Sequence, residues 1–201
     1  MEKRSSETTI PPESRILQIH FDDWKWRKAT VYDIDDKLEL YRVECHMRKP
    51  HVILRGNSSR ENHDPAVNIL GEASVHCLSS RISVKIQDQQ FELSSCGAFR
   101  RGYKYGSPSA GNARREWRSK NKCGYFDLIL IDETTTPIAR ITLSMWRLHK
   151  AAKIEIMSKD VWQANKALEE VILTGLVVMQ NRLTMYNATL GASAISTAIV
   201  A

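Results

Sequence analysis

The sequence predicts a mainly β protein, an antiparallel β-barrel of about twelve strands that encloses one hydrophobic C-terminal α-helix. Two observations support this prediction. Many short segments with strand-like patterns follow one another, and turn-forming residues separate them. In addition, the segment 160–186 contains the run VILTGLVVM, in which Thr174 is the only residue that is neither apolar nor glycine. A helix that is apolar on all sides is buried in protein or in lipid.

The segment 160–186 is predicted to be a helix in the core of the protein. Asp160 and Gln163 have the spacing of a capping box at its start, and the segment is far longer than an ordinary strand. A bilayer span needs about 20 mainly apolar residues. The apolar run between the polar residues at 169–170 and 180–182 is shorter than that. Gly175 costs a helix about 1 kcal/mol relative to alanine, so we expect another backbone to approach closely there.

Upstream of this helix, the pattern is that of strands. WKWRKATVYDI (24–34) and LELYRVECHM (38–47) alternate with a period of two, and Asp35-Asp36 lies in the turn between them. Further strands are predicted at residues 15–21, 51–55, 66–78, 81–86, 91–94, 98–105, 113–119, 125–132, 137–145 and 153–157. A closed sheet has no free edges, and a barrel of about twelve strands is too wide for its own side chains to fill. The apolar helix is therefore expected to fill the lumen.

With 201 residues, a single domain is expected. Residues 1–14 are interpreted as a flexible N-terminal tail, 15–186 as the barrel with its central helix, and 187–201 as a small-residue C-terminal tail that frays. The start, MEKRSSETTIPPES, is polar, and no hydrophobic secretory segment follows it. We therefore expect a cytoplasmic protein that is not secreted, and any contact with a membrane is expected to be peripheral.

No pattern in the sequence indicates catalysis or a bound metal. The cysteines lie at positions 45, 77, 96 and 123, without zinc-finger spacing, so they are interpreted as free thiols and no cofactor is expected. GxSxG, GxGxxG, Walker and HExxH motifs are absent from the sequence. Asp22-Asp23 and Asp35-Asp36 resemble paired carboxylates, but both occur where turns are needed. The expectation is a protein that is not an enzyme.

Positive charge is concentrated in one segment. The chain has a formal net charge of +6, and residues 97–122 contain eight basic residues and one acid, Glu116, which gives a local charge of +7. The turn-forming loop SPSAGN (107–112) favours a hairpin of two strands that also carry aromatic residues. Arginine forks match phosphate oxygens, and basic residues near an anionic leaflet contribute about 1 kcal/mol each. The candidate anion-binding residues are Arg100, Arg101, Lys104, Arg114, Arg115 and Arg118.

Other interpretations of this basic segment stay open. A charge patch is often a solvated surface without a ligand. Basic residues interleaved with aromatic ones also bind single-stranded nucleic acid, but no RNP1, zinc-finger or helix-turn-helix motif supports that here. Nucleic acid is therefore disfavoured as a partner. The pair Glu169-Glu170, at the mouth of the predicted helix, is expected either to face solvent or to pair with an arginine.

Several of these segments resemble the tubby C-terminal-like superfamily, which includes tubby proteins, phospholipid scramblases, plant LURP-one-related proteins and a fungal tubby-like group. The resemblance is carried by Trp24-Lys25-Trp26, GEASVHCLSSRISVKI (71–86), YFDLILID (125–132) and EEVILTGLVVMQNRL (169–183), and it spans residues 15–186. The fungal group is the most similar. The resemblance implies a non-enzymatic barrel, whose tubby members bind phosphoinositide head groups and whose scramblase members add calcium-binding acids and a membrane anchor. No EF-hand loop or lipid-binding motif of the superfamily is matched residue by residue.

Together these observations lead to the expectation of a non-enzymatic binding module. Its expected partner is an anionic phospholipid or phosphoinositide membrane surface, contacted through the basic hairpin. The alternative is an intracellular protein-interaction or regulatory scaffold that has no specific lipid ligand and in which the basic hairpin is incidental.

Overall fold

In the computed structural model, the strands pair in antiparallel order and close into one barrel, as the sequence predicts. The structure describes residues 14–22, 26–57, 68–76, 81–97, 102–119, 126–144 and 151–199. Within these residues, strands that are consecutive in the chain are neighbours in the sheet, and the pairing of the last strand with the first closes the ring. The strands are β1 (Arg15–Phe21), β2 (Lys28–Asp33), β3 (Glu39–Cys45), β4 (Val52–Gly56), β5 (Ile69–His76), β6 (Arg81–Ile86), β7 (Gln89–Ser95), β8 (Gly102–Ser107), β9 (Ala113–Ser119), β10 (Asp127–Ile131), β11 (Pro137–Ser144) and β12 (Ala151–Ile156).

The alternating pattern of each strand sends every second side chain into the barrel. In β6, for example, Ile82, Val84 and Ile86 are buried, whereas Arg81 and Lys85 face solvent. A one-residue slip would exchange these two sets, so burial of one face determines the pairing register of the strands.

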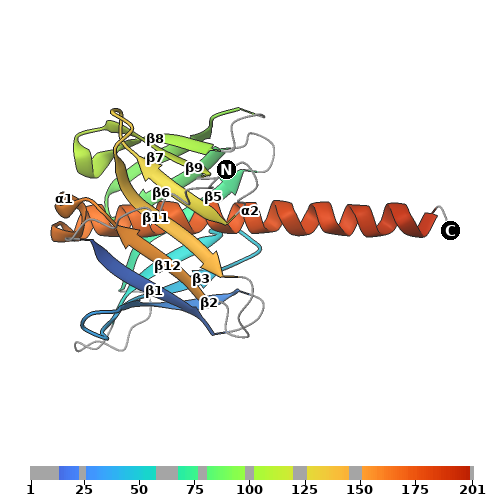
Figure 1. Cartoon of the computed structure of the whole chain (residues 1–201), viewed down its shortest axis with the longest axis horizontal. Helices are drawn as coiled ribbons and strands as arrows, with labels where there is room; N and C mark the ends of the chain where they lie inside the picture. Colours follow the sequence, from blue (N-terminus) through green and yellow to red (C-terminus); the bar gives the residue numbers. More distant parts are fainter. Residues whose placement is uncertain are drawn as a thin grey trace, which may run out of the picture.

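The lumen is filled by the C-terminal helix α2 (Asn165–Ile199), which follows the short helix α1 (Lys159–Gln163). Figure 1 shows α2 running through the barrel and continuing beyond the ends of the strands. Val171, Ile172 and Leu173 are fully buried. A Cβ atom at Gly71 of β5 would lie 2.7 Å from Cδ2 of Leu173, so the absence of a side chain there lets the helix pack closely against the wall.

The ends of the helix differ from the prediction. Ser158 precedes α1 in an extended conformation, and Asp160 lies inside the first turn of α1, so Asp160 is not the N-cap. Ala164 is also extended and separates α1 from α2, and its carbonyl accepts the N–H of Leu168. The helix α2 extends to Ile199, beyond residue 186, where the sequence analysis placed the end of the central helix. The alanines and the absence of proline favour helix there.

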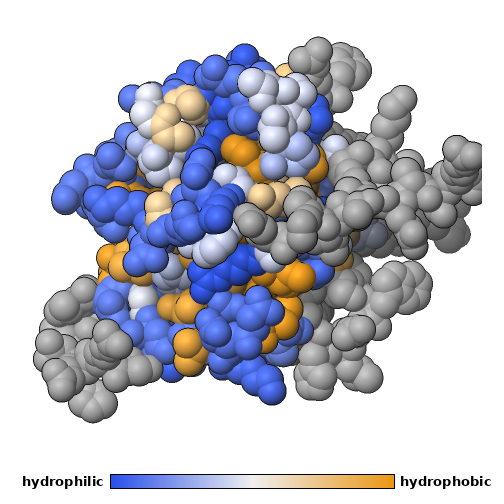
Figure 2. Space-filling view, turned by 60° about the vertical axis from the view of Figure 1, so that its left-hand side comes forward, coloured by the Kyte–Doolittle hydropathy of each residue, from blue (hydrophilic) through white to orange (hydrophobic). Residues whose placement is uncertain are grey.

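The outer wall of the barrel is mainly hydrophilic. Figure 2 shows one side of the molecule, where hydrophilic residues cover most of the described surface and apolar residues form small separate patches between them. On the outer wall, neighbouring strands are joined by ion pairs, including Arg55–Glu44 (2.9 Å) and Arg140–Asp127 (2.8 Å). None of the helices in the described part of the chain is long and apolar enough to cross a membrane.

Candidate functional site

Strands β8 and β9 form the hairpin that the SPSAGN loop predicts. Their register pairs Gly102 with Arg118 at one end and Ser107 with Ala113 at the other. The connection consists of a 3-10 turn, η1 (Pro108–Ala110), followed by Gly111 and Asn112. Both of these residues have positive φ angles, 63° and 66°, a conformation that glycine and asparagine tolerate best.

The hairpin has two faces with different chemistry. Tyr103, Tyr105 and Ser107 of β8 point into the barrel, and so do Arg115 and Trp117 of β9. The outer face carries Lys104, Gly106, Arg114, Glu116 and Arg118.

This division separates the predicted anion-binding residues. Lys104, Arg114 and Arg118 are exposed on the outer face. Arg115, which the sequence analysis grouped with these cations as a candidate anion-binding residue, is not part of that surface, because it is 7% exposed and points into the lumen. Because side chains alternate along a strand, Arg115 shares the face of Trp117. Arg100 and Arg101 lie outside the described residues.

Arg115 forms a buried ion pair with the central helix. Its Nη1 donates to Oε1 of Glu170 at 3.1 Å, and both side chains are less than 10% exposed. The same carboxylate accepts the hydroxyl of Ser107 at 2.6 Å and the backbone N–H of Ser109 at 3.0 Å. A buried charge is tolerated when it is paired and hydrogen-bonded in this way. Of the two expectations for Glu170, pairing with an arginine is therefore the one observed.

Further polar contacts continue this connection along α2. Glu170, Thr174 and Asn181 are spaced by four and seven residues, which places them on one side of a helix. The contacts are Trp117 Nε1 to Thr174 Oγ1 (3.0 Å), Asn181 Nδ2 to Tyr103 Oη (2.6 Å) and Arg182 Nη1 to Ser119 Oγ (2.7 Å). The inner face of the hairpin therefore orients α2 within the barrel through a row of specific hydrogen bonds.

Gly175 lies at the centre of this row. A Cβ atom at this position would be 3.0 Å from Cζ2 and 3.1 Å from Cη2 of Trp117. The expected close approach is thus present, but it involves the indole ring and not another backbone.

Burial alters the ionisation of several groups in the lumen. Burial raises the pKa of Tyr105, and the nearby carboxylate of Glu170 raises it further. Burial likewise raises the pKa of Tyr103. Glu169 accepts a hydrogen bond from Gln87 Nε2 at 3.3 Å, but burial is the dominant effect and raises the pKa of its carboxyl group. These shifts favour the neutral forms of the three groups, in keeping with their position in the core.

The outer face carries cations, with carboxylates among them. The guanidinium of Arg114 lies 3.8 Å from Glu116, and the backbone N–H of Arg114 donates to Glu133 at 2.7 Å. Lys104 is the cross-strand neighbour of Glu116. The described outer face is therefore less positive than the segment as a whole.

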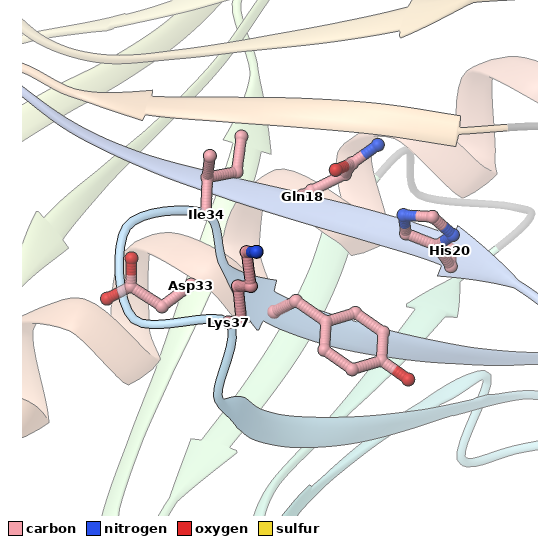
Figure 3. A pocket seen from close by; sticks show the side chains of 6 residues that line it. Gln18, His20, Asp33, Ile34 and Lys37 are labelled. Atoms are coloured by element: carbon pink, nitrogen blue, oxygen red, sulfur yellow. The ribbon is translucent and has the colours of Figure 1, made fainter.

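A second feature is a surface pocket of about 450 Å³ on the opposite wall. It lies over β1, β2 and the turn that follows β2, and its lining residues are Gln18, His20, Tyr32, Asp33, Ile34 and Lys37 (Figure 3). No pattern in the sequence indicates this pocket. The alternation of RILQIHF places Gln18 and His20 on one face, but their proximity to Tyr32 and Lys37 depends on strand register and on the conformation of the turn.

The described residues contain no group of three histidine, cysteine, aspartate or glutamate side chains that could hold a metal ion. Comparisons with protein-family models, curated proteins and solved structures gave no significant match for this chain.

Proposed function

We propose that the protein is a non-enzymatic binding module that associates with anionic phospholipid surfaces through the outer face of hairpin β8–β9. The observation that carries the proposal is the outward row of Lys104, Arg114 and Arg118, which lies on a hairpin whose inner face is bonded to the core. A cationic surface on a rigid support is suited to contact with anionic head groups.

The shape of the surface defines the mode of binding. The three cations follow two neighbouring strands on the outside of the barrel, with Glu116 between Arg114 and Arg118. An open row of this kind favours bulk electrostatic attraction over enclosure of one head group, and such attraction weakens with salt. The barrel with its central helix is also the fold that the resemblance to the tubby C-terminal-like superfamily implies, and this supports the proposal. A cytoplasmic location of the protein is part of the same proposal.

The second candidate is a protein-interaction scaffold without a lipid ligand. The observation that favours it is the presence of Glu116 and Glu133 beside Arg114. They offset part of the charge that a membrane would recognise.

Vesicle co-sedimentation tests the proposal. Neutral phosphatidylcholine vesicles are compared with vesicles that contain phosphatidylserine or a phosphoinositide, at low and at physiological salt. We expect binding to the anionic vesicles that decreases with salt. Reversal of the three outer cations (Lys104→Glu, Arg114→Glu, Arg118→Glu) should weaken partitioning by at least roughly 100-fold, because each lost cation contributes about 1 kcal/mol and the new carboxylates are repelled by the anionic surface.

A matched variant controls for net charge. Lys28→Glu, Arg81→Glu and Lys85→Glu change three exposed cations on other strands. Loss of binding in the hairpin variant alone supports the proposal. Equal loss in both variants, or wild-type protein that binds no anionic vesicle, contradicts it and favours the protein-interaction scaffold.

A further inference from the structure

Five of the six side chains that line the pocket on the β1–β2 wall carry a polar group, although most of the lining surface is apolar. Gln18 and His20 project from β1, and Lys37 projects from the turn after β2 (Figure 3). Tyr32 of β2 also lines the pocket. The rings of His20 and Tyr32 are in edge-to-face contact, with centroids 5.5 Å apart. Within the described residues, the amide of Gln18, the hydroxyl of Tyr32 and the ammonium of Lys37 make no hydrogen bond or ion pair.

The one acid in the lining, Asp33, is already paired with a cation, Arg15. Asp33 is 2% exposed, and its Oδ2 accepts two hydrogen bonds from the guanidinium of Arg15. Its other oxygen, Oδ1, accepts the backbone N–H of Asp35 at 3.1 Å. An anion in the pocket would therefore meet donors, and the carboxylate of Asp33 would not repel it strongly.

Ile34 adds an apolar side to the same pocket. It is 41% exposed at the start of the turn that follows β2. Figure 3 shows its side chain near that of Lys37. The volume of the pocket lies within the range of about 300–1,000 Å³ that is common for small-molecule sites. Such sites combine apolar surface with a few polar groups that orient the ligand.

The position of the pocket separates it from the hairpin. Around the barrel, β10, β11 and β12 lie between β9 and β1, and five strands lie between β2 and β8 on the other side. A flat membrane that touches the outer face of β8–β9 leaves the β1–β2 wall in water. The choice of a soluble molecule as the ligand of this pocket therefore rests on the proposed function of the hairpin.

We propose that the pocket binds a small soluble organic oxyanion, a phosphate or carboxylate group attached to an apolar body. Lys37, the amide of Gln18 and the hydroxyl of Tyr32 donate to the oxyanion, and the apolar body packs on Ile34. The residues of this site and those of the proposed lipid contact lie on different walls of the barrel, so each set can be varied separately.

Titration with phenyl phosphate, followed by NMR of the Gln18 side-chain amide and the His20 ring, tests the proposal. We expect saturable shifts of both groups, with inorganic phosphate binding more weakly because it lacks the apolar body. Lys37→Ala should raise the dissociation constant by about tenfold, since it removes a charge-assisted contact. Lys85→Ala on β6 is the matched control and should leave the constant unchanged. A circular dichroism spectrum confirms that each variant is folded.

The same variants identify the source of the oxyanion. If Lys37→Ala reduces binding to phosphoinositide vesicles as much as it reduces binding to phenyl phosphate, the ligand is a lipid head group and the soluble ligand is wrong. Absence of shifts at Gln18 and His20, or equal effects of Lys37→Ala and Lys85→Ala, also overturns the proposal.

Discussion

The inner and outer faces of hairpin β8–β9 use arginine in two different ways. Arg115 points inward, where its guanidinium is buried against Glu170 of the central helix. Arg118, three residues later, points outward and is exposed to solvent. The two side chains are chemically identical, but only Arg115 has left water. The face of the strand on which an arginine lies therefore determines whether it forms part of the core or part of the surface.

The energetic consequences of the two environments differ. Removal of one partner of a buried ion pair leaves an uncompensated charge and costs about 3–5 kcal/mol. Exposed ion pairs contribute about 0–1 kcal/mol, because water and salt screen them. We thus expect the inner face of the hairpin to determine stability and the outer face to be available for binding.

Glu170→Gln should have the largest effect on stability. The substitution leaves Arg115 buried without a counter-charge, and we expect a loss of about 3–5 kcal/mol in the free energy of unfolding. Urea denaturation followed by circular dichroism measures it. Asp127→Asn, which disrupts the partly exposed pair with Arg140 on the outer wall, is the matched control and should cost no more than about 1 kcal/mol. Equal losses would remove the distinction between the two faces.

Gly175→Ala tests how closely the helix packs on the inner face. The new methyl group would lie 3.0 Å from the indole of Trp117, whose position is fixed by the hydrogen bond to Thr174. Overpacking costs about 1–3 kcal/mol, and alanine returns about 1 kcal/mol of helix propensity, so a small net destabilisation is expected.

Trp117→Phe provides the companion variant, because phenylalanine lacks the indole ring atoms that the new methyl group would meet. The double variant should lose less stability than the sum of the two single variants. Strict additivity would show that the ring and the glycine do not determine each other's packing.

Glu169→Gln should increase stability slightly. Burial raises the pKa of Glu169 above its ordinary value of 4.5, so the folded state favours the protonated carboxyl group. The contribution of this group to stability is complete below pH 4.5 and is lost as the pH rises through the raised pKa. Glutamine cannot ionise, and it keeps an acceptor for Gln87.

Denaturation of this variant and of the wild type at several pH values measures the effect. The variant should gain stability relative to the wild type as the pH rises from 4.5 to 7, by less than about 1 kcal/mol. A loss of stability at neutral pH would show that the charged carboxylate is required. The neighbouring Glu170→Gln variant should change stability in the opposite direction, because Glu170 forms a buried ion pair, whereas Glu169 accepts its hydrogen bond from the neutral amide of Gln87.

The fold could be predicted because two patterns were strong. The run VILTGLVVM identified the buried helix, and period-two alternation identified the strands. The limits of the helix were harder to predict, since the break at Ala164 contains no proline or glycine. Element boundaries depend on tertiary contacts that a local pattern does not contain.

The site could be predicted only in part. Clustering of charge identified the hairpin, and the alternation of ARREWRS already places Arg115 with Trp117 and apart from Arg114 and Arg118. A count of charges along the segment does not distinguish the inner face of the hairpin from the outer face. The β1–β2 pocket had no local pattern, because it combines Gln18 with Lys37, which takes a positive φ of 53° in the turn after β2.

The most direct test measures the free energies of unfolding of Arg115→Ala and Arg118→Ala side by side. These variants remove the same side chain from the same strand, on opposite faces. Arg115→Ala should lose about 3–5 kcal/mol, and Arg118→Ala should stay within about 0.5 kcal/mol of the wild type. If the two variants lost similar amounts of stability, the division of the hairpin into a structural inner face and a binding outer face would be wrong.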